Sequence, residues 1–337
     1  MLFPPGSWGR RPLQLLRSSV LVGAPQAVPF QAGTPIDAAA SLPSAERRSS
    51  TLVAHLRLAR PGDNLFAFVG TLLGAGLAGV SASAWSIAAV AISNALLSAG
   101  SMMINDWHDV AEDAVNRPDR PIPSGAVPRP RALAMGLGAL AAGCAVATVA
   151  GWRFAMAAVV ITGLSGLYTA RLKAIPVLGN GVIGLLSAYP LWCWYAMDGL
   201  DGRAYLGAAA GFFVAGAGRE MVRTAGDAAG DAARGLRTVA TRWGVRTANH
   251  CGFALILAGC LVAWCTALGS TLIWYRVVLA LCLALCLALL VGVGGSRLLA
   301  DPPARASRRV TAIARGLTVL LALGVAGDLL AGGWGPR

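Results

Sequence analysis

The chain is poor in charged residues, and poorer still in the side chains that hold metals through nitrogen or sulfur. Only 13% of its 337 residues are charged, with 15 acids, three histidines and a single lysine, Lys173. A soluble domain carries roughly 25% charged residues, so this composition excludes an ordinary soluble protein. The seven cysteines show no paired metal-ligand spacing, which argues against a structural zinc site. We interpret them as small, buried apolar residues.

The chain contains many long apolar segments. The chain is 56% hydrophobic, and its mean hydropathy is +0.64. A helix that crosses a bilayer needs about 20 apolar residues. Stretches of this kind lie near 64–83, 85–104, 131–150, 153–170, 177–196, 204–223, 249–268, 274–294 and 311–331. The pattern predicts an all-α, multi-pass membrane bundle of about nine transmembrane helices.

The basic residues predict an orientation for this bundle. With the amino terminus inside, 24 of the 28 Lys and Arg residues fall on the cytoplasmic side and 4 on the other. Positive loops stay in the cytoplasm, so we expect a cytoplasmic amino terminus and a carboxy terminus on the opposite side. Arginines beside a membrane attract anionic lipid or a diphosphate, which explains the +13 net charge without a nucleic acid partner. The membrane expected is a bacterial cell membrane, with an organelle membrane as the alternative.

The amino-terminal residues differ from the rest of the chain. Residues 1–50 are rich in Arg, Ser, Pro and Ala and show no sustained helical period. We expect residues 1–52 to be a disordered cytoplasmic extension, since such composition buries little apolar surface. An organelle transit peptide is the alternative, because these peptides are rich in Arg and Ser and poor in acids. Residues 53–334 would form the membrane-embedded domain.

Five of the acidic residues fall between positions 106 and 119. Asp106, Asp109 and Asp113 are spaced 3 and 4 apart, which would place all three carboxylates on one face of a continuing helix. Like charges repel at that spacing, and ions are costly at the mouth of a membrane helix. Mg²⁺ would remove the repulsion, and it binds one or two carboxylates together with substrate phosphate oxygens. The spacing therefore predicts a site for Mg²⁺ and a phosphate-bearing substrate, with a plain acidic loop helix as the alternative.

A second polar cluster follows the sixth predicted span. Glu220, Thr224, Asp227 and Asp231 are spaced 4, 3 and 4 apart, again one helical face. Taken alone, this cluster could equally be a solvated helix end with ordinary Arg–Asp pairs. Both clusters follow even-numbered spans, so both should lie on the cytoplasmic side. We expect them to converge on one cytoplasm-facing active-site cavity.

These motifs resemble those of the UbiA superfamily of intramembrane prenyltransferases. That family carries Asn-Asp-x-x-Asp-x-x-x-Asp after its second helix and an Asp-rich motif after its sixth. Here the first motif is complete, as Asn105, Asp106, Asp109 and Asp113. Its ending at 117–125 is similar to the branch with chlorophyll synthases, homogentisate prenyltransferases and archaeal ether-lipid prenyltransferases. The likeness covers roughly residues 55–331.

The resemblance implies Mg²⁺-dependent transfer of a prenyl group from an allylic prenyl diphosphate to a small aromatic or lipid acceptor. The implied catalytic and metal-binding residues are Asp106, Asp109, Asp113, Asp227 and Asp231. The residues implied or proposed to bind the diphosphate are Asn105, Arg120, Lys173, Arg223, Tyr168 and Asn180. The second motif departs from the family pattern, because Thr224 occupies the position of its first aspartate. A hydroxyl is a weaker metal ligand than a carboxylate.

Two other functions fit parts of the pattern. A terpene cyclase on the same scaffold would use the same aspartates, with an alkene of the substrate capturing the carbocation. A membrane transporter or non-catalytic scaffold is the other alternative. The intact first motif argues against it, because such a protein has no need to keep metal ligands.

Overall fold

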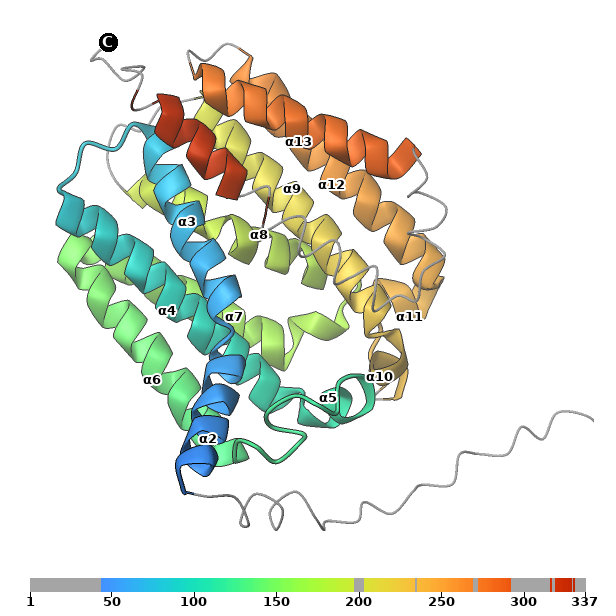
Figure 1. The fold of residues 1–337 in the computed structure, drawn as a ribbon. Helices are drawn as coiled ribbons and strands as arrows, with labels where there is room; N and C mark the ends of the chain where they lie inside the picture. Colours follow the sequence, from blue (N-terminus) through green and yellow to red (C-terminus); the bar gives the residue numbers. More distant parts are fainter. Residues whose placement is uncertain are drawn as a thin grey trace, which may run out of the picture.

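The computed structural model describes residues 44–196, 203–233, 235–268, 272–291, 316, 319–328 and 330. Within these ranges all regular structure is helical, and none of it is β-strand (Figure 1). This confirms the predicted all-α class.

Each predicted span coincides with a helix. These helices are α3 (Pro61–Ala78), α4 (Ala84–His108), α6 (Arg129–Ala147), α7 (Trp152–Ala170), α8 (Leu178–Trp192), α9 (Arg203–Gly226), α12 (Val245–Ala267), α13 (Ile273–Val291) and Val319–Asp328. By length and composition, four described helices can cross a membrane: Ala84–His108, Arg129–Ala150, Trp152–Ala170 and Val245–Ala267. The count of nine spans therefore stays a prediction.

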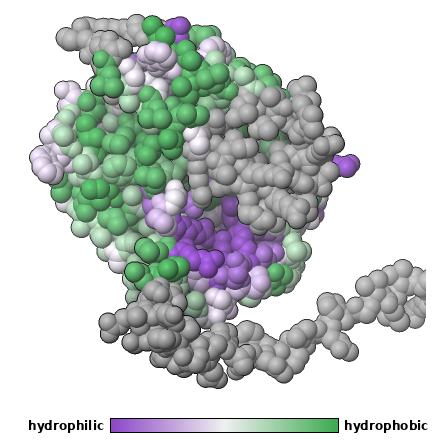
Figure 2. Space-filling model, in the orientation of Figure 1, coloured by the Kyte–Doolittle hydropathy of each residue, from purple (hydrophilic) through white to green (hydrophobic). Residues whose placement is uncertain are grey.

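Short helices occupy one end of the bundle. They are α5 (Val110–Asn116), α10 (Ala228–Ala233) and α11 (Val239–Trp243). Figure 1 places α5 beside α10, although more than a hundred residues separate them in the chain. Figure 2 shows hydrophilic residues gathered at this end, whereas apolar residues cover the flank over α4 and α6. The polar chemistry of the protein is thus concentrated where α4 and α9 end.

Close backbone packing fixes the position of α9. A Cβ atom added to Gly218 would lie 2.4 Å from the carbonyl oxygen of Gly252 in α12, and one added to Gly259 would lie 2.4 Å from that of Gly211. Small residues allow membrane helices to approach this closely. The carboxyl-terminal end of α9, which carries the second cluster, is therefore held by contacts along the length of α12.

A helix begins within the predicted amino-terminal extension. We expected disorder through residue 52, but helix α2 (Ser44–Ala59) already begins at Ser44. Ala54 and Leu58, four residues apart, are buried with Ala99 and Met103 of α4, and this packing stabilises a helix whose first half is polar. Residues 1–43 lie outside the described part of the chain.

Candidate active site

The first aspartate cluster spans a break between two helices. Helix α4 ends at His108, Asp109 has φ −90° and ψ 15°, and α5 starts at Val110. The continuous helix that the spacing suggested is thus interrupted at Asp109. Asp106 and Asp113 nevertheless share one cation: Arg120 Nη1 lies 3.0 Å from Asp106 Oδ1 and also donates to Asp113 Oδ2. Burial raises the pKa of Asp113, although the Arg120 guanidinium lowers it.

Lys173 joins this cluster from the segment between α7 and α8. Its Nζ atom lies 2.8 Å from Asp109 Oδ2 and 2.9 Å from each carboxylate oxygen of Glu112. Asn105 Nδ2 donates to the same oxygen of Asp109 at 2.8 Å. Burial opposes the charged form of Lys173, but the Asp109 and Glu112 carboxylates together raise the lysine pKa above its ordinary value. The sole lysine of the chain is therefore a buried ammonium held by two carboxylates.

The second cluster is built on the last turns of α9. Glu220 accepts a hydrogen bond from the Tyr168 hydroxyl at 2.8 Å and from Arg223 Nε at 2.7 Å. Arg223 also reaches Asp227 Oδ2 through Nη1 at 3.2 Å. Tyr168 comes from α7, so this network ties the second cluster to the helix that leads into Lys173.

The two clusters meet, as predicted. Arg117, which follows α5, donates from Nη2 to Asp227 Oδ1 at 2.5 Å. The side chain of Asn116 contacts the backbone of the second motif at two points. Sequence segments 110 residues apart therefore form one polar site.

Asp231 is the exception within this network. It is fully buried, and neither carboxyl oxygen has a hydrogen-bond partner among the described residues. Burial, followed by the neighbouring Glu112 carboxyl group, raises the pKa of Asp231 to about 8. Two buried oxygen ligands are thus left without a donor.

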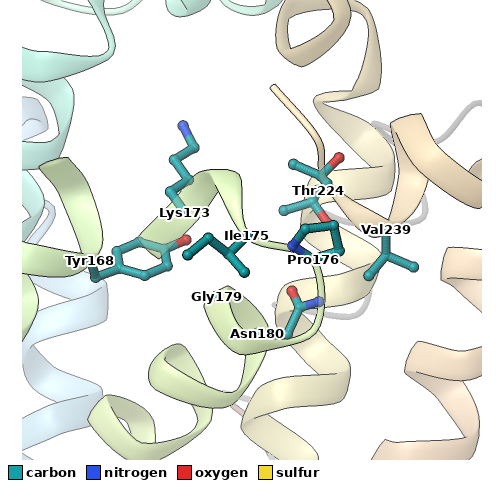
Figure 3. A pocket seen from close by; sticks show the side chains of 9 residues that line it. Tyr168, Lys173, Ile175, Pro176, Gly179, Asn180, Thr224 and Val239 are labelled. Carbon is teal, nitrogen blue, oxygen red and sulfur yellow. The ribbon is translucent and has the colours of Figure 1, made fainter. Parts of the chain in front are cut away.

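A small cavity lies beside these charges (Figure 3). Tyr168 and Lys173 line one side, Thr224 of α9 lines the other, and Asn180 lies at the bottom in the view of Figure 3. The Thr224 hydroxyl donates to the carbonyl oxygen of Met221 at 3.0 Å, one turn back in its own helix. All eleven residues implicated by the sequence therefore lie at this end of the bundle, and all of them except Asp231 are connected by ion pairs, hydrogen bonds or the shared cavity.

Three charged residues of the site were missed by the sequence analysis. Arg60 Nη2 lies 2.6 Å from Asp106 Oδ1, Glu112 pairs with Lys173, and Arg117 pairs with Asp227. Arg60 sits between α2 and α3 with a left-handed φ of 52°, an uncommon conformation for a residue with a side chain. The residue before a proline is disfavoured in the α conformation, so the Arg60-Pro61 pair was the available signal for this break.

The residues present suit a hard cation such as Mg²⁺ in their chemistry. They offer carboxylate oxygens from two elements, including the two unpartnered oxygens of Asp231. Within the described residues, however, no three His, Cys, Asp or Glu side chains already form a metal cage, since arginines and Lys173 occupy most of the carboxylates. Mg²⁺ usually completes its coordination with substrate phosphates and water rather than with a protein cage. The donor set therefore fits a metal that enters together with a phosphate ligand.

Sequence comparison places the chain among known proteins. Residues 66–312 match the model of the UbiA prenyltransferase family. The digeranylgeranylglyceryl phosphate synthase of Methanoregula boonei is 36% identical over 242 residues, which cover 70% of this chain and 81% of the relative. The enzyme of the same name from Methanopyrus kandleri is 33% identical over 231 residues, covering 68% and 83%. Of the three kinds of enzyme in the branch that the motif ending resembles, these relatives belong with the archaeal ones.

Solved structures share the fold. A UbiA homologue from Archaeoglobus fulgidus, determined with GPP and Mg²⁺ bound, superposes with a TM-score of 0.61 at 20% identity, covering 81% of this chain and 99% of the homologue. The apo UbiA homologue from Aeropyrum pernix gives a TM-score of 0.63 at 15% identity, covering 80% and 98%. Together with the match over most of its length, this shows that the chain is a membrane prenyltransferase that belongs to the UbiA prenyltransferase family.

Proposed function

We propose that this enzyme transfers a prenyl group from an allylic prenyl diphosphate to a lipid acceptor, with Mg²⁺ as cofactor. The observation that carries the proposal is the convergence of both acidic motifs on one buried site. There, seven carboxylates from α4, the α4–α5 junction, α5, α9, the α9–α10 junction and α10 face five cations. A site of such dense and nearly balanced charge suits a highly charged ligand better than an apolar one.

An exchange of partners would accommodate that ligand. The cations Arg120, Lys173 and Arg223 now neutralise carboxylates, and each has the chemistry to bind a diphosphate instead. The carboxylates of Asp106, Asp109, Asp113, Asp227 and Asp231 would then be released to hold the metal. Both sets of charges would stay paired, so the buried site would avoid the cost of isolated ions.

The metal, when bound, supplies positive charge against the negative charge that develops on the departing diphosphate. The protein's own groups do the rest. Arg120, Lys173 and Arg223 orient the diphosphate, and Asn105 fixes Asp109 through its 2.8 Å hydrogen bond. The apolar helices keep water from the allylic cation that remains when the carbon–oxygen bond breaks. An acceptor oxygen then forms the new bond to that carbon and loses its proton.

The acceptor is proposed from the relatives. Two relatives at 33% and 36% identity are digeranylgeranylglyceryl phosphate synthases, and these matches favour a prenylated glyceryl phosphate over an aromatic acceptor. A geranylgeranyl group would be the corresponding donor chain. Such amphiphilic substrates would reach the polar site from the bilayer, with their charged groups at the end of the bundle that carries α5 and α10.

We also propose the orientation that the basic residues favour, with this polar end in the cytoplasm and residues 53–334 as the membrane domain. Asp119 and Arg153 are exposed and lie at opposite ends of the α4–α6 layer. In a cysteine-free background, a cysteine at position 119 should react with an impermeant reagent from the cytoplasmic side, and one at position 153 from the other. Labelling of both from the same side would refute the orientation.

The proposed function is tested with purified protein, geranylgeranyl diphosphate and Mg²⁺, with and without a geranylgeranylglyceryl phosphate acceptor. Mass spectrometry should find the doubly prenylated product only when acceptor and metal are both present. A cyclised hydrocarbon formed without acceptor would favour the terpene cyclase instead. Absence of any turnover with these substrates would refute the proposed pair.

A further inference from the structure

A single asparagine links the two acidic motifs, and no charge is involved. Asn116 is the last residue of α5, directly before Arg117. Its Nδ2 atom donates to the backbone carbonyl oxygen of Asp227 at 3.1 Å, and its Oδ1 atom accepts from the backbone N–H of Gly230, also at 3.1 Å. One amide thus contacts a donor and an acceptor on the same turn of chain, at the start of α10.

Gly230 is the residue that permits this contact. A Cβ atom at position 230 would lie 2.3 Å from Asn116 Nδ2, inside contact distance. The glycine is needed here for close approach, since its helical position in α10 requires no unusual backbone angle. Any larger residue would push the Asn116 amide away from both of its partners.

The Asn116 contacts bridge the two carboxylate clusters, whose separation must suit any ligand that binds to both. Asn116 lies three residues after Asp113, and its two backbone partners, Asp227 and Gly230, lie within the stretch from Asp227 to Asp231. We propose that Asn116 is a positioning residue that, together with Gly230, sets the separation of the two carboxylate clusters. This inference rests on the proposed function, in which both clusters hold Mg²⁺.

The neighbouring ion pair between Arg117 and Asp227 also links the two clusters, but it cannot keep their separation constant during the reaction. Asp227 is one of the carboxylates that must be free to hold metal, so its pair with Arg117 has to loosen when the ligand arrives. The Asn116 contacts go to backbone atoms and need no such exchange. They can therefore hold the two motifs at a constant distance in both the free and the loaded enzyme.

The inference is tested with Asn116→Ala, Gly230→Ala and the double variant in the full-length enzyme, by titrating the initial rate of prenyl transfer with Mg²⁺. Residues that orient metal ligands without touching the metal typically contribute about 10- to 100-fold in metal affinity or activity. Each single change should therefore raise the half-saturating Mg²⁺ concentration by about tenfold. The double variant should be no worse than Asn116→Ala, because both changes break the same contact.

Matched controls separate this role from a general loss of packing. Val115→Ala alters an exposed neighbour on α5, and Gly138→Ala adds a methyl group where nothing lies within 4 Å. Both should keep the wild-type Mg²⁺ requirement. A merely structural role for Asn116 would lower the unfolding temperature and the amount of active enzyme, but leave the half-saturating Mg²⁺ of the surviving enzyme unchanged.

Three results would overturn the inference. One is a half-saturating Mg²⁺ concentration in Asn116→Ala that equals that of the wild type. Another is a Gly230→Ala defect that persists in full and adds to that of Asn116→Ala. The third is a wild-type enzyme that transfers the prenyl group without Mg²⁺, which would refute the metal part of the proposed function itself. The titration of the wild type thus tests the proposed function. The ratio of the half-saturating Mg²⁺ concentrations of variant and wild type tests the role of Asn116.

Discussion

The two acidic clusters differ in how their charges are balanced. In the first cluster, Asp106, Asp109, Glu112 and Asp113 all meet Arg60, Arg120 or Lys173, cations that come from outside the cluster. In the second cluster, Glu220 and Asp227 pair with Arg223 of α9, which also carries Glu220 and ends just before Asp227, and Asp227 also pairs with Arg117. Asp231 has no hydrogen-bond partner among the described residues. Every carboxylate of the first cluster is thus paired with a cation, whereas the second cluster contains one buried carboxyl group that is not paired with any described residue.

Because of this difference, substitutions in the two clusters should affect the stability of the protein differently from its activity. Removing one partner of a buried ion pair leaves the other charge uncompensated and is strongly destabilising. Removing a buried carboxyl group that has no partner relieves a desolvation penalty instead. Replacing a paired carboxylate of the first cluster or Asp231 of the second should therefore lower activity in both cases, yet only the first change should destabilise the metal-free protein.

The largest effect is expected for Asp109→Ala in the first cluster. This change removes a proposed metal ligand and leaves Lys173 with Glu112 alone. Loss of one group that stabilises transition-state charge commonly costs 10²- to 10³-fold in rate, and we expect a loss of at least about 100-fold. The rate is measured at saturating Mg²⁺ with purified protein, alongside thermal unfolding without metal, which should occur at a lower temperature than in the wild type.

Asp119→Ala is the matched control for Asp109→Ala. Its side chain is 81% exposed and lies 4.0 Å from Arg57, a surface pair of little energetic weight. Activity and unfolding temperature should both stay at wild-type values. Near-normal activity in Asp109→Ala with limiting Mg²⁺ would remove the first motif from the mechanism.

Asp231→Asn tests the other side of the comparison. The amide keeps the shape of the side chain but loses the charge that a metal would use, so prenyl transfer should fall by about 10- to 100-fold. The metal-free protein should unfold at the same temperature as the wild type or higher, because a buried, unpaired carboxyl group is gone. A clear drop in unfolding temperature would show that Asp231 is paired in the free enzyme, and the contrast between the clusters would fail.

The sequence predicted the aspartates of both clusters and three of the cations beside them, Arg120, Lys173 and Arg223, but it did not predict the roles of Arg60 and Arg117. Asp106, Asp109, Asp113, Asp227 and Asp231 stand out because carboxylates are rare here and their spacing is helical. Arg60 was missed because it lies 46 residues from Asp106, and no local period connects an arginine at a helix break to a distant aspartate. Glu112 was overlooked because its partner, Lys173, lies 61 residues away. The long helices followed from apolar run length alone, whereas the break at Asp109, whose side chain contacts Lys173 64 residues away, has no local signal in the sequence.

Arg60→Ala should produce a smaller effect than loss of a carboxylate. Asp106 would keep Arg120 at 3.0 Å, so the cluster would remain partly neutralised. We expect about a tenfold loss of prenyl transfer, a typical cost for a residue that supports a metal ligand. Arg57→Ala is the matched control, because that side chain is 63% exposed and three residues away. Equal activity in the two variants would show that Arg60 does not support the active site.

The smallest effects concern Thr224, the position for which the resemblance to the family implies an aspartate. Its hydroxyl bonds the Met221 carbonyl within its own helix, so Thr224→Ala should leave the rate nearly unchanged. The side chain is only 4% exposed and lines the cavity beside Lys173 (Figure 3), so an aspartate there would add a buried carboxylate three residues before Asp227. Carboxylate number is a main control of cation affinity at oxygen sites. Thr224→Asp should therefore lower the half-saturating Mg²⁺ concentration, measured by titrating the initial rate. An unchanged or higher value would mean that position 224 serves its helix alone, and that the second cluster holds metal through Asp227 and Asp231 without it.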